Sequence, residues 1–289
     1  MKAPDFQYVK PKTVDECLAL LAEHGDAAHV LAGGQSLMPL LNLRLAAPAV
    51  LIDINGLGDL GGIRESGDMI TIGALTRHEQ IAASPIVQRR LPLLAEAAPH
   101  IAHVAIRTRG TIGGSVAPAD PAAEWPACCL ALGAQIELAS VRGRRRIVAA
   151  DYFQGLYTTA RESDELVAAI HFPVPAAGQV HRFREMARRH GDFAIAGLAL
   201  VAARRGAALH DVRLALFGVA DRPLLAPKAM AVIEGRALDA KIIANARDAL
   251  RAELDPPEDP AHPADYKRRV AGVLLERALA DLKAEFLDA

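Results

Sequence analysis

Two glycine pairs are the residues of this chain best suited to binding chemistry. The segment AGGQS spans residues 32–36, TIGGS spans residues 111–115, and each follows an apolar stretch and ends in a small hydroxyl residue. A glycine pair gives the backbone access to positive φ and leaves no Cβ in the way of a ligand. Successive N–H groups in such turns can form a concave anion site. Two such loops in one chain predict a diphosphate held between them.

The first loop offers backbone donors and a hydroxyl group. The N–H groups from Gly33 to Ser36 are expected to face phosphate oxygens, and a helix that begins after the loop would add a favourable N-terminal dipole. The loop has neither the GxGxxG pattern of a dinucleotide fold nor the GxxxxGK[ST] pattern of a phosphate loop, so both of those sites are disfavoured. Ser36 and Ser115 would need an organised base to act as nucleophiles, and the sequence indicates none.

The second loop has charged neighbours. Arg107 and Arg109 precede it, and Glu124 follows it on a short predicted helix. Gly113 and Gly114 can approach a ligand through their backbone, because neither carries a side chain. Glu124 can accept hydrogen bonds from ribose hydroxyls, as acidic residues do in other dinucleotide sites. The alternative is that Glu124 is a first-turn residue favoured by the helix dipole.

Metal and cluster chemistry on this chain is disfavoured. Its cysteines are Cys17, Cys128 and Cys129, whereas an iron–sulfur cluster normally needs four thiolates. His100 and His103 have ligand-like spacing, but the sequence indicates no third ligand beside them. We therefore expect neither a catalytic residue nor a metal site here, and any cluster must come from another polypeptide.

The composition excludes several classes of partner. Hydrophobic residues make up 52% of the 289 residues and aromatic residues only 4%, so the core must be mostly aliphatic. The net charge of −1 provides no global field for nucleic acid or an anionic membrane. No apolar run approaches the roughly 20 residues that span a bilayer, and MKAPDFQYVKP lacks the apolar centre of a signal peptide. We expect a cytoplasmic protein without an integral membrane segment, and we interpret the basic residues 142–146 as a solvated hairpin tip.

The hydrophobic pattern predicts an α+β protein with a boundary near residues 175–178. In the first part, helices are predicted at 13–24 with Thr13 as the N-cap, 37–45, 76–83 with Thr76 as the cap, 92–102, and from Asp120 or Pro121 to Leu132. Strands there are predicted before AGGQS, at 49–54, at 69–74, in a hairpin over 136–149 and at 165–175. In the second part, antiparallel strands at 181–187, 193–205 and 212–219 precede helices at 226–234, 239–253 and 264–287.

The two glycine segments together resemble the double-glycine signatures of the FAD-binding medium subunits of molybdenum hydroxylases, the xanthine dehydrogenase and carbon monoxide dehydrogenase group. The resemblance covers essentially the whole chain and includes FQYVKP, LIDI, SPIVQRRLPLLAEAA, RTRGTIGGS and GDFAIAG at 191–197. It implies that residues 1–176 form an FAD-binding domain of the PCMH, or vanillyl-alcohol-oxidase, type with two subdomains. It also implies that residues 177–289 form a C-terminal domain of one sheet with helices, as in carbon monoxide dehydrogenase flavoproteins.

The resemblance further implies which residues contact FAD. Both glycine loops would hold the pyrophosphate, a segment near residue 101 would lie along the cofactor, and Phe193 falls where some relatives place a tyrosine against the isoalloxazine ring. Phe193 can stack there but cannot donate a hydrogen bond. The implied contacts are Val30, Leu31, Ala32, Gly33, Gly34, Gln35, Ser36, Leu37, Ile101, Ala102, Ile106, Gly110, Thr111, Gly113, Gly114, Ser115, Ala117, Glu124 and Phe193.

The function implied by the resemblance is electron transfer by a flavoprotein subunit. A large subunit would carry the molybdenum cofactor and oxidise the substrate, and a small subunit would carry the [2Fe–2S] clusters, in a dimer of heterotrimers. Electrons would reach FAD on this chain and leave to an external acceptor, while the protein supplies binding and orientation. Two alternatives remain open, namely a stand-alone FAD-dependent oxidase of the same fold and a non-catalytic nucleotide-binding module.

Overall fold

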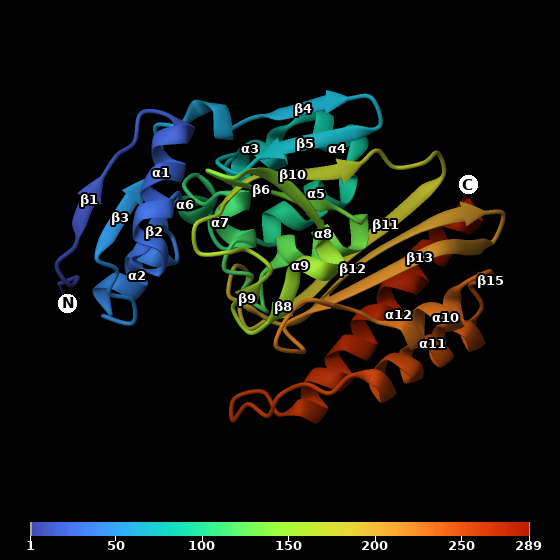
Figure 1. Cartoon of the computed structure of the whole chain (residues 1–289). Coiled ribbons are helices and arrows are strands. Elements are labelled where there is room, and N and C mark those ends of the chain that lie inside the picture. Colours follow the sequence, from blue (N-terminus) through green and yellow to red (C-terminus); the bar gives the residue numbers. More distant parts are fainter. Residues whose placement is uncertain (1, 289) are drawn as a thin grey trace.

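A small parallel sheet forms the first subdomain of the computed structural model, which describes residues 2–288. Its elements are β1 (Gln7–Val9), α1 (Val14–His24), η1 (Gly25–Ala27), β2 (Ala28–Leu31), α2 (Leu37–Asn42) and β3 (Val50–Asp53). The strand order is β1-β3-β2, and both pairs are parallel. Thr13 caps α1 as predicted, because its Oγ1 accepts a hydrogen bond of 3.1 Å from Glu16 N. Figure 1 shows this subdomain in blue at one side of the molecule.

The second subdomain is an antiparallel sheet covered by short helices. Its strands are β4 (Ile63–Ser66), β5 (Met69–Gly73), β6 (Gln135–Ser140), β7 (Gly143–Val148) and β10 (Leu166–Pro173), with β8 (Phe153–Gly155) and β9 (Thr158–Thr159) paired beside them. Its helices are η2 (Gly58–Leu60), α3 (His78–Ala83), α4 (Pro85–Arg90), α5 (Pro92–Ala97), η3 (Ala98–His100), α6 (Val104–Arg107), α7 (Ile112–Val116), α8 (Glu124–Leu132) and α9 (Ala149–Tyr152). The strand order β4-β5-β10-β6-β7 confirms the predicted strands at 69–74 and 165–175 and the hairpin over 136–149.

The C-terminal part is a second antiparallel sheet with helices on its outer face. Its elements are β11 (Gln179–Ala187), β12 (Ala194–Arg205), β13 (Ala208–Phe217), β14 (Leu224–Leu225), α10 (Pro227–Ile233), β15 (Arg236–Ala237), α11 (Ala240–Glu253) and α12 (Ala264–Asp288). Side chains alternate along β12, so Leu198 and Leu200 pack against the helices while Ala199 and Val201 face the first half of the chain. The predicted strands and the three predicted helices of this part are confirmed.

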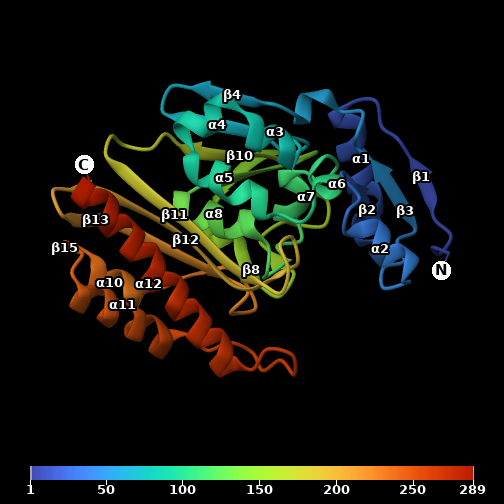
Figure 2. The ribbon, with the colours of Figure 1, turned by 180° about the vertical axis from the view of Figure 1, so that it is seen from behind.

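The hydrophobic core crosses the predicted boundary at residue 176. Trp125 of α8 belongs to the same buried cluster as Phe183 of β11 and Phe217 of β13. Figure 2 shows α5 and α8 between the two antiparallel sheets, with α12 on the outer face of the second one. Glu96 of α5 also forms an ion pair of 3.0 Å with Arg184 of β11. The two halves are therefore joined by a continuous apolar layer, and the chain simply passes from β10 to β11 at the boundary.

Four predicted helix boundaries are wrong, and one of them is the end of the helix predicted at 37–45, which lies at Asn42. Thr76 does not cap α3, because its hydroxyl donates to Gly62 O at 3.1 Å and Arg77 occupies the cap position. The helix that starts at Pro92 ends at Ala97 and continues only as the 3-10 turn η3. The helix predicted from Asp120 or Pro121 is α8, and it begins at Glu124, because Asp120 Oδ1 accepts a hydrogen bond from Ala122 N and makes a turn instead.

Membrane insertion can be checked helix by helix. In the part of the chain that the structure describes, none of the helices combines the length and the apolar character needed to cross a bilayer.

Candidate functional site

The first glycine loop packs against Arg109 and Gly110, which directly precede the second loop. β2 and β3 are parallel, with Leu31 beside Asp53, so AGGQS leaves the sheet at the carboxyl ends of both strands. A Cβ added to Gly33 would lie 2.5 Å from Arg109 O and 2.7 Å from Gly110 Cα. A side chain at residue 33 would therefore push the loops apart. Segments from two different subdomains thus meet at one sheet edge, the arrangement that a shared diphosphate would require.

The first loop keeps its backbone donors unpaired. Among residues 2–288, no backbone or side-chain atom accepts a hydrogen bond from the N–H groups of Gly33 to Leu37. Gly34 has φ +71°, the left-handed conformation that favours glycine. The helix dipole contributes less than the sequence predicts, because α2 has only six residues. The available donors are therefore the loop amides themselves, together with the exposed Ser36 hydroxyl.

The second loop, predicted as a loop throughout, is from Ile112 onward the short helix α7, and its backbone donors are already paired. Gly113 N donates to Ala74 O at 2.9 Å, and Gly114 N donates to the Thr111 hydroxyl oxygen at 3.1 Å. Gly113 is buried against Ala74, where an added Cβ would overlap the Ala74 side chain and lie 2.8 Å from its carbonyl oxygen. The expected backbone-first approach of Gly113 to a ligand is therefore not available. This loop offers a ligand the exposed Gly114 and the half-buried Ser115 instead.

Two polar side chains that the sequence analysis did not single out connect the loops. Asn55 Nδ2 donates to Ala32 O at 2.7 Å, and Arg77 Nη2 donates to Asn55 Oδ1 at 2.7 Å. Arg77 Nη1 donates to Arg109 O, the atom against which Gly33 packs. The sequence could have pointed to both residues. Asn55 follows shortly after the buried strand β3 and Arg77 shortly after β5, and each strand ends near a glycine loop.

The buried side chain of His78 packs against Gly110, directly before the second loop. Trp125 Nε1 donates to His78 Nδ1 at 2.9 Å, and His78 Nε2 lies so close to Gly110 that an added Cβ would be 2.6 Å away. Burial, followed by the charges of Arg107 and Arg77, lowers the pKa of His78 to about 4. His78 is therefore neutral at pH 7, with Nδ1 as the acceptor and the proton on Nε2.

The segment near Ile101 forms a tight turn next to the GDF segment. Ala102 has φ +45°, an unusual value for a residue with a side chain. Arg107 holds this turn, because its Nη1 donates to Ala102 O at 2.7 Å and to Ile101 O at 3.0 Å. Gly191 packs against Ala102 O and the His103 ring. The structure thus brings the predicted residues 101–102 beside the loop that carries Phe193, whose side chain is 72% exposed.

Glu124 differs from the other predicted contacts because it is buried among carboxyl groups. It is the first residue of α8, and burial raises its pKa to about 8, with smaller contributions from Glu185 and Asp120. Within residues 2–288, no side-chain hydrogen bond or ion pair joins Glu124 to either glycine loop. Its carboxyl group is mainly protonated at pH 7, so it can donate as well as accept a hydrogen bond. Its contact with a ribose stays a prediction.

The remaining predicted contacts lie along the same two segments. Val30 is half-buried at the end of β2, and Leu37 is half-buried at the start of α2. Ile106 O accepts a hydrogen bond of 2.7 Å from Gly110 N, which ties the turn near Ala102 to the second loop. Ala117 N donates to Gly113 O at 2.9 Å where α7 ends.

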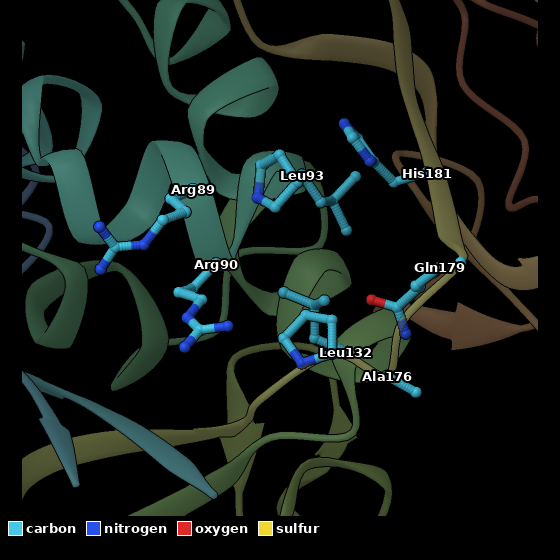
Figure 3. A pocket seen from close by; sticks show the side chains of 10 residues that line it. Arg89, Arg90, Leu93, Leu132, Ala176, Gln179 and His181 are labelled. Atoms are coloured by element: carbon cyan, nitrogen blue, oxygen red, sulfur yellow. The ribbon is translucent and has the colours of Figure 1, made fainter.

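A cavity of about 160 Å³ lies elsewhere, between the two halves of the chain. Figure 3 shows Arg89 and Arg90 on one side of it and Gln179 and His181 on the other. Pockets for drug-sized ligands usually measure about 300–1,000 Å³, and both arginines already pair with Glu65, at 3.5 and 2.8 Å. We therefore place the candidate site at the glycine loops and not at this cavity.

Comparisons with known proteins cover nearly the whole chain. Residues 4–175 match the family described as the FAD binding domain in molybdopterin dehydrogenase, and residues 181–282 match the carbon monoxide dehydrogenase flavoprotein C-terminal domain. The carbon monoxide dehydrogenase medium chain of Hydrogenophaga pseudoflava is 42% identical over 96% of this chain and 97% of its own length. Caffeine dehydrogenase subunit beta of Pseudomonas sp. (strain CBB1) is 37% identical over 97% of this chain and 95% of its own. A chain in the crystal structure of quinoline 2-oxidoreductase from Pseudomonas putida 86 is 33% identical, with a TM-score of 0.94 over 99% of this chain and 100% of that one.

Proposed function

This chain belongs to the family of FAD-binding medium subunits of molybdenum hydroxylases, and from that premise we propose that it binds FAD between its two glycine loops. The family consists of oxidoreductase subunits, and FAD is its cofactor. When bound between the two loops, FAD would supply redox chemistry that links [2Fe–2S] clusters on a partner subunit to an external electron acceptor. The observation that carries the proposal is the contact between Gly33 and Arg109 O, because it brings the loop with free amides against the segment of the other subdomain that carries Ser115 and Arg109.

The donors of the site fit the pyrophosphate of FAD. The unpaired amides from Gly33 to Leu37 are arranged in a turn, and successive amides of this kind favour an anion. Ser36 and Ser115 can add hydroxyl donors from the two sides. The exposed Arg109 side chain adds a positive charge next to the loops. We propose that these groups hold the diphosphate, and that the segment near Ala102 and Phe193 lies along the flavin.

The chain itself supplies binding and orientation, while a partner subunit oxidises the substrate. Cys128 and Cys129 are buried, and burial raises the pKa values of both thiols. Such thiols are poor cluster ligands, which agrees with clusters held by a separate small subunit. We propose that a large subunit carrying the molybdenum cofactor completes the complex, and that two heterotrimers associate as a dimer.

The relatives support a division of labour between subunits. Relatives of comparable identity belong to a carbon monoxide dehydrogenase, a caffeine dehydrogenase and a quinoline oxidoreductase. A similar flavoprotein chain therefore accompanies the oxidation of chemically unrelated substrates. This is the pattern expected when the substrate binds on the partner and this chain serves only electron transfer.

Flavin content tests the proposed function directly. The chain is purified together with its coexpressed partner subunits, and the flavin is quantified by its absorption near 450 nm and by chromatography after release. We expect near-stoichiometric FAD in these complexes. Complexes with intact clusters but no flavin would refute the proposal. Adenine nucleotide without flavin would favour a nucleotide-binding module.

A further inference from the structure

We propose that Asn55 and Arg77 form a clasp that sets the spacing of the two glycine loops and thereby positions the FAD pyrophosphate. Asn55 follows β3 in the first subdomain, and Arg77 precedes α3 in the second. The path runs from Ala32 O to Asn55 Nδ2, from Asn55 Oδ1 to Arg77 Nη2, and from Arg77 Nη1 to Arg109 O. Two side chains thus connect a carbonyl of the first loop to a carbonyl of the second. The inference rests on the proposed function.

The clasp is held rigidly at its first end. Asp53 Oδ1 accepts hydrogen bonds from Asn55 N at 2.9 Å and from Asn55 Nδ2 at 2.7 Å, and Asp53 Oδ2 accepts one from the Tyr8 hydroxyl. The amide plane of Asn55 is therefore fixed from the sheet side. This fixes its Oδ1 as the acceptor that faces Arg77.

The second end is equally constrained. Arg77 N donates to Gln80 Oε1 at 2.8 Å, and residue 77 pairs as an isolated bridge with Thr111 at the start of the second loop. The backbone of Arg77 thus moves with that loop, while its guanidinium reaches across to Asn55. A planar guanidinium donates from two nitrogens in a fixed geometry, which an ammonium group cannot reproduce. The donor geometry of residue 77, more than its charge, should therefore determine how the loops are spaced.

The contact at Gly33 explains why spacing matters. The loops touch without a side chain between them, so a small change in their spacing would shift the free amides of the first loop relative to Ser115 and Arg109. The clasp acts on Arg109 O, the same atom that limits the approach of Gly33. Because it touches the loop carbonyls and leaves the free amides of the first loop untouched, we regard it as a positioning device.

The test compares FAD dissociation constants for variants of the purified, deflavinated complex. The variants are Arg77→Ala, Arg77→Lys, Asn55→Ala and the Arg77→Ala/Asn55→Ala double variant, with Arg205→Ala as a control. Arg205 is exposed, and its ion pair of 3.2 Å with Asp211 of the C-terminal sheet is exposed as well, so the pair contributes little to stability. We expect each single clasp variant to bind FAD about 10- to 50-fold more weakly, while the thermal midpoint of the apo complex stays close to that of the control.

Two outcomes separate a clasp from a merely charged or stabilising residue. The double variant should lose no more affinity than the weaker-binding single variant, because the two residues act as one unit. Arg77→Lys should not restore FAD affinity, since lysine keeps the positive charge but cannot donate from two nitrogens in a fixed plane. Additive losses, or full rescue by lysine, would overturn the clasp while leaving the FAD site intact. Failure of the unaltered complex to bind FAD would instead overturn the proposed function.

Discussion

The two glycine loops share a sequence pattern but meet opposite physical demands. In the first loop, the amides from Gly33 to Leu37 are unpaired and Gly34 adopts a left-handed conformation. In the second loop, the amides of Gly113 and Gly114 are paired within the protein, and Gly113 is buried against Ala74. The first pair keeps donors open, whereas the second pair allows close packing. A glycine pair therefore does not by itself identify a ligand-binding backbone.

This difference assigns each loop a separate role in the proposed site. The second loop is a rigid wall of the proposed site, meaning that its position is fixed. Its amides donate hydrogen bonds to the segment between β5 and α3, and His78, held by Trp125, packs against it. The first loop supplies the open donors and rests on that wall at Gly33. Changes in the second loop should therefore act mainly on stability, and changes in the first mainly on cofactor affinity.

The largest expected effect comes from Gly113→Val. A side chain there would overlap Ala74, including its backbone, and overpacking of this kind costs about 3 kcal/mol. We expect the free energy of unfolding to fall by that amount in urea titrations of the apo chain. The matched variant is Gly114→Val, since Gly114 is exposed and its added Cβ would meet two side-chain atoms and no backbone, namely the Thr111 hydroxyl oxygen at 2.8 Å and Ala32 Cβ at 4.0 Å.

Gly114→Val should therefore remain folded but lose FAD. Equal stability of the two variants would show that the second loop is not the rigid wall described here. Retention of FAD by Gly114→Val would argue that the exposed side of this loop lies outside the cofactor site.

The second prediction concerns acid and the support beneath the second loop. The pKa of His78 is lowered in the folded chain to about 4, from an ordinary value of 6.5, mainly by burial. The unfolded chain therefore binds more protons between these values, so this residue destabilises the fold as the pH falls through that window. Between pH 7 and pH 5 the loss is about 2 kcal/mol.

The control is His78→Gln, whose carbonyl oxygen can still accept from Trp125 Nε1. Glu124 contributes with the opposite sign, because its raised pKa makes the fold bind more protons than the unfolded chain. We therefore compare the unfolding free energy of the unaltered chain with that of His78→Gln at each pH. The first value minus the second should fall as the pH is lowered from 7 to 5. A difference that does not change with pH would contradict a neutral, buried His78.

Much of this architecture could be predicted from the sequence because it depends on local patterns. The alternation of β12 and the aliphatic run of β3 identify strands whatever surrounds them. The helix starts near Thr76 and Asp120 were predicted wrongly because both side chains have other hydrogen-bond partners, Gly62 O and Ala122 N. Pairing of the Gly113 amide was also beyond sequence reasoning, because its acceptor, Ala74 O, comes from a distant segment.

The third prediction tests the open loop through backbone conformation. Gly34→Ala forces a side chain into φ +71°, and its Cβ would lie 3.1 Å from Leu31 Cδ1. Strain of about 1–2 kcal/mol should rearrange the loop, so we expect FAD to bind about tenfold more weakly. Gly206→Ala is the matched control, because Gly206 has φ +64° with no atom within 4 Å of the added Cβ. Both variants should lose similar stability, and an equal loss of FAD affinity in both would rule out a local effect at the loop.

The smallest expected effect compares the two hydroxyl residues next to the glycine pairs. Thr111 caps α7 by accepting a hydrogen bond from Gly114 N, whereas Ser36 makes no capping hydrogen bond at α2 and is exposed. Loss of a capping hydroxyl costs about 1 kcal/mol, so Thr111→Ala should lower the unfolding free energy of the apo chain by this amount. Ser36→Ala should leave that free energy unchanged and weaken FAD binding a few-fold, as loss of one hydrogen bond does. If Ser36→Ala destabilised the apo chain as much as Thr111→Ala, the first loop would also contribute to stability through its hydroxyl group. The proposed difference between the two loops would then be wrong.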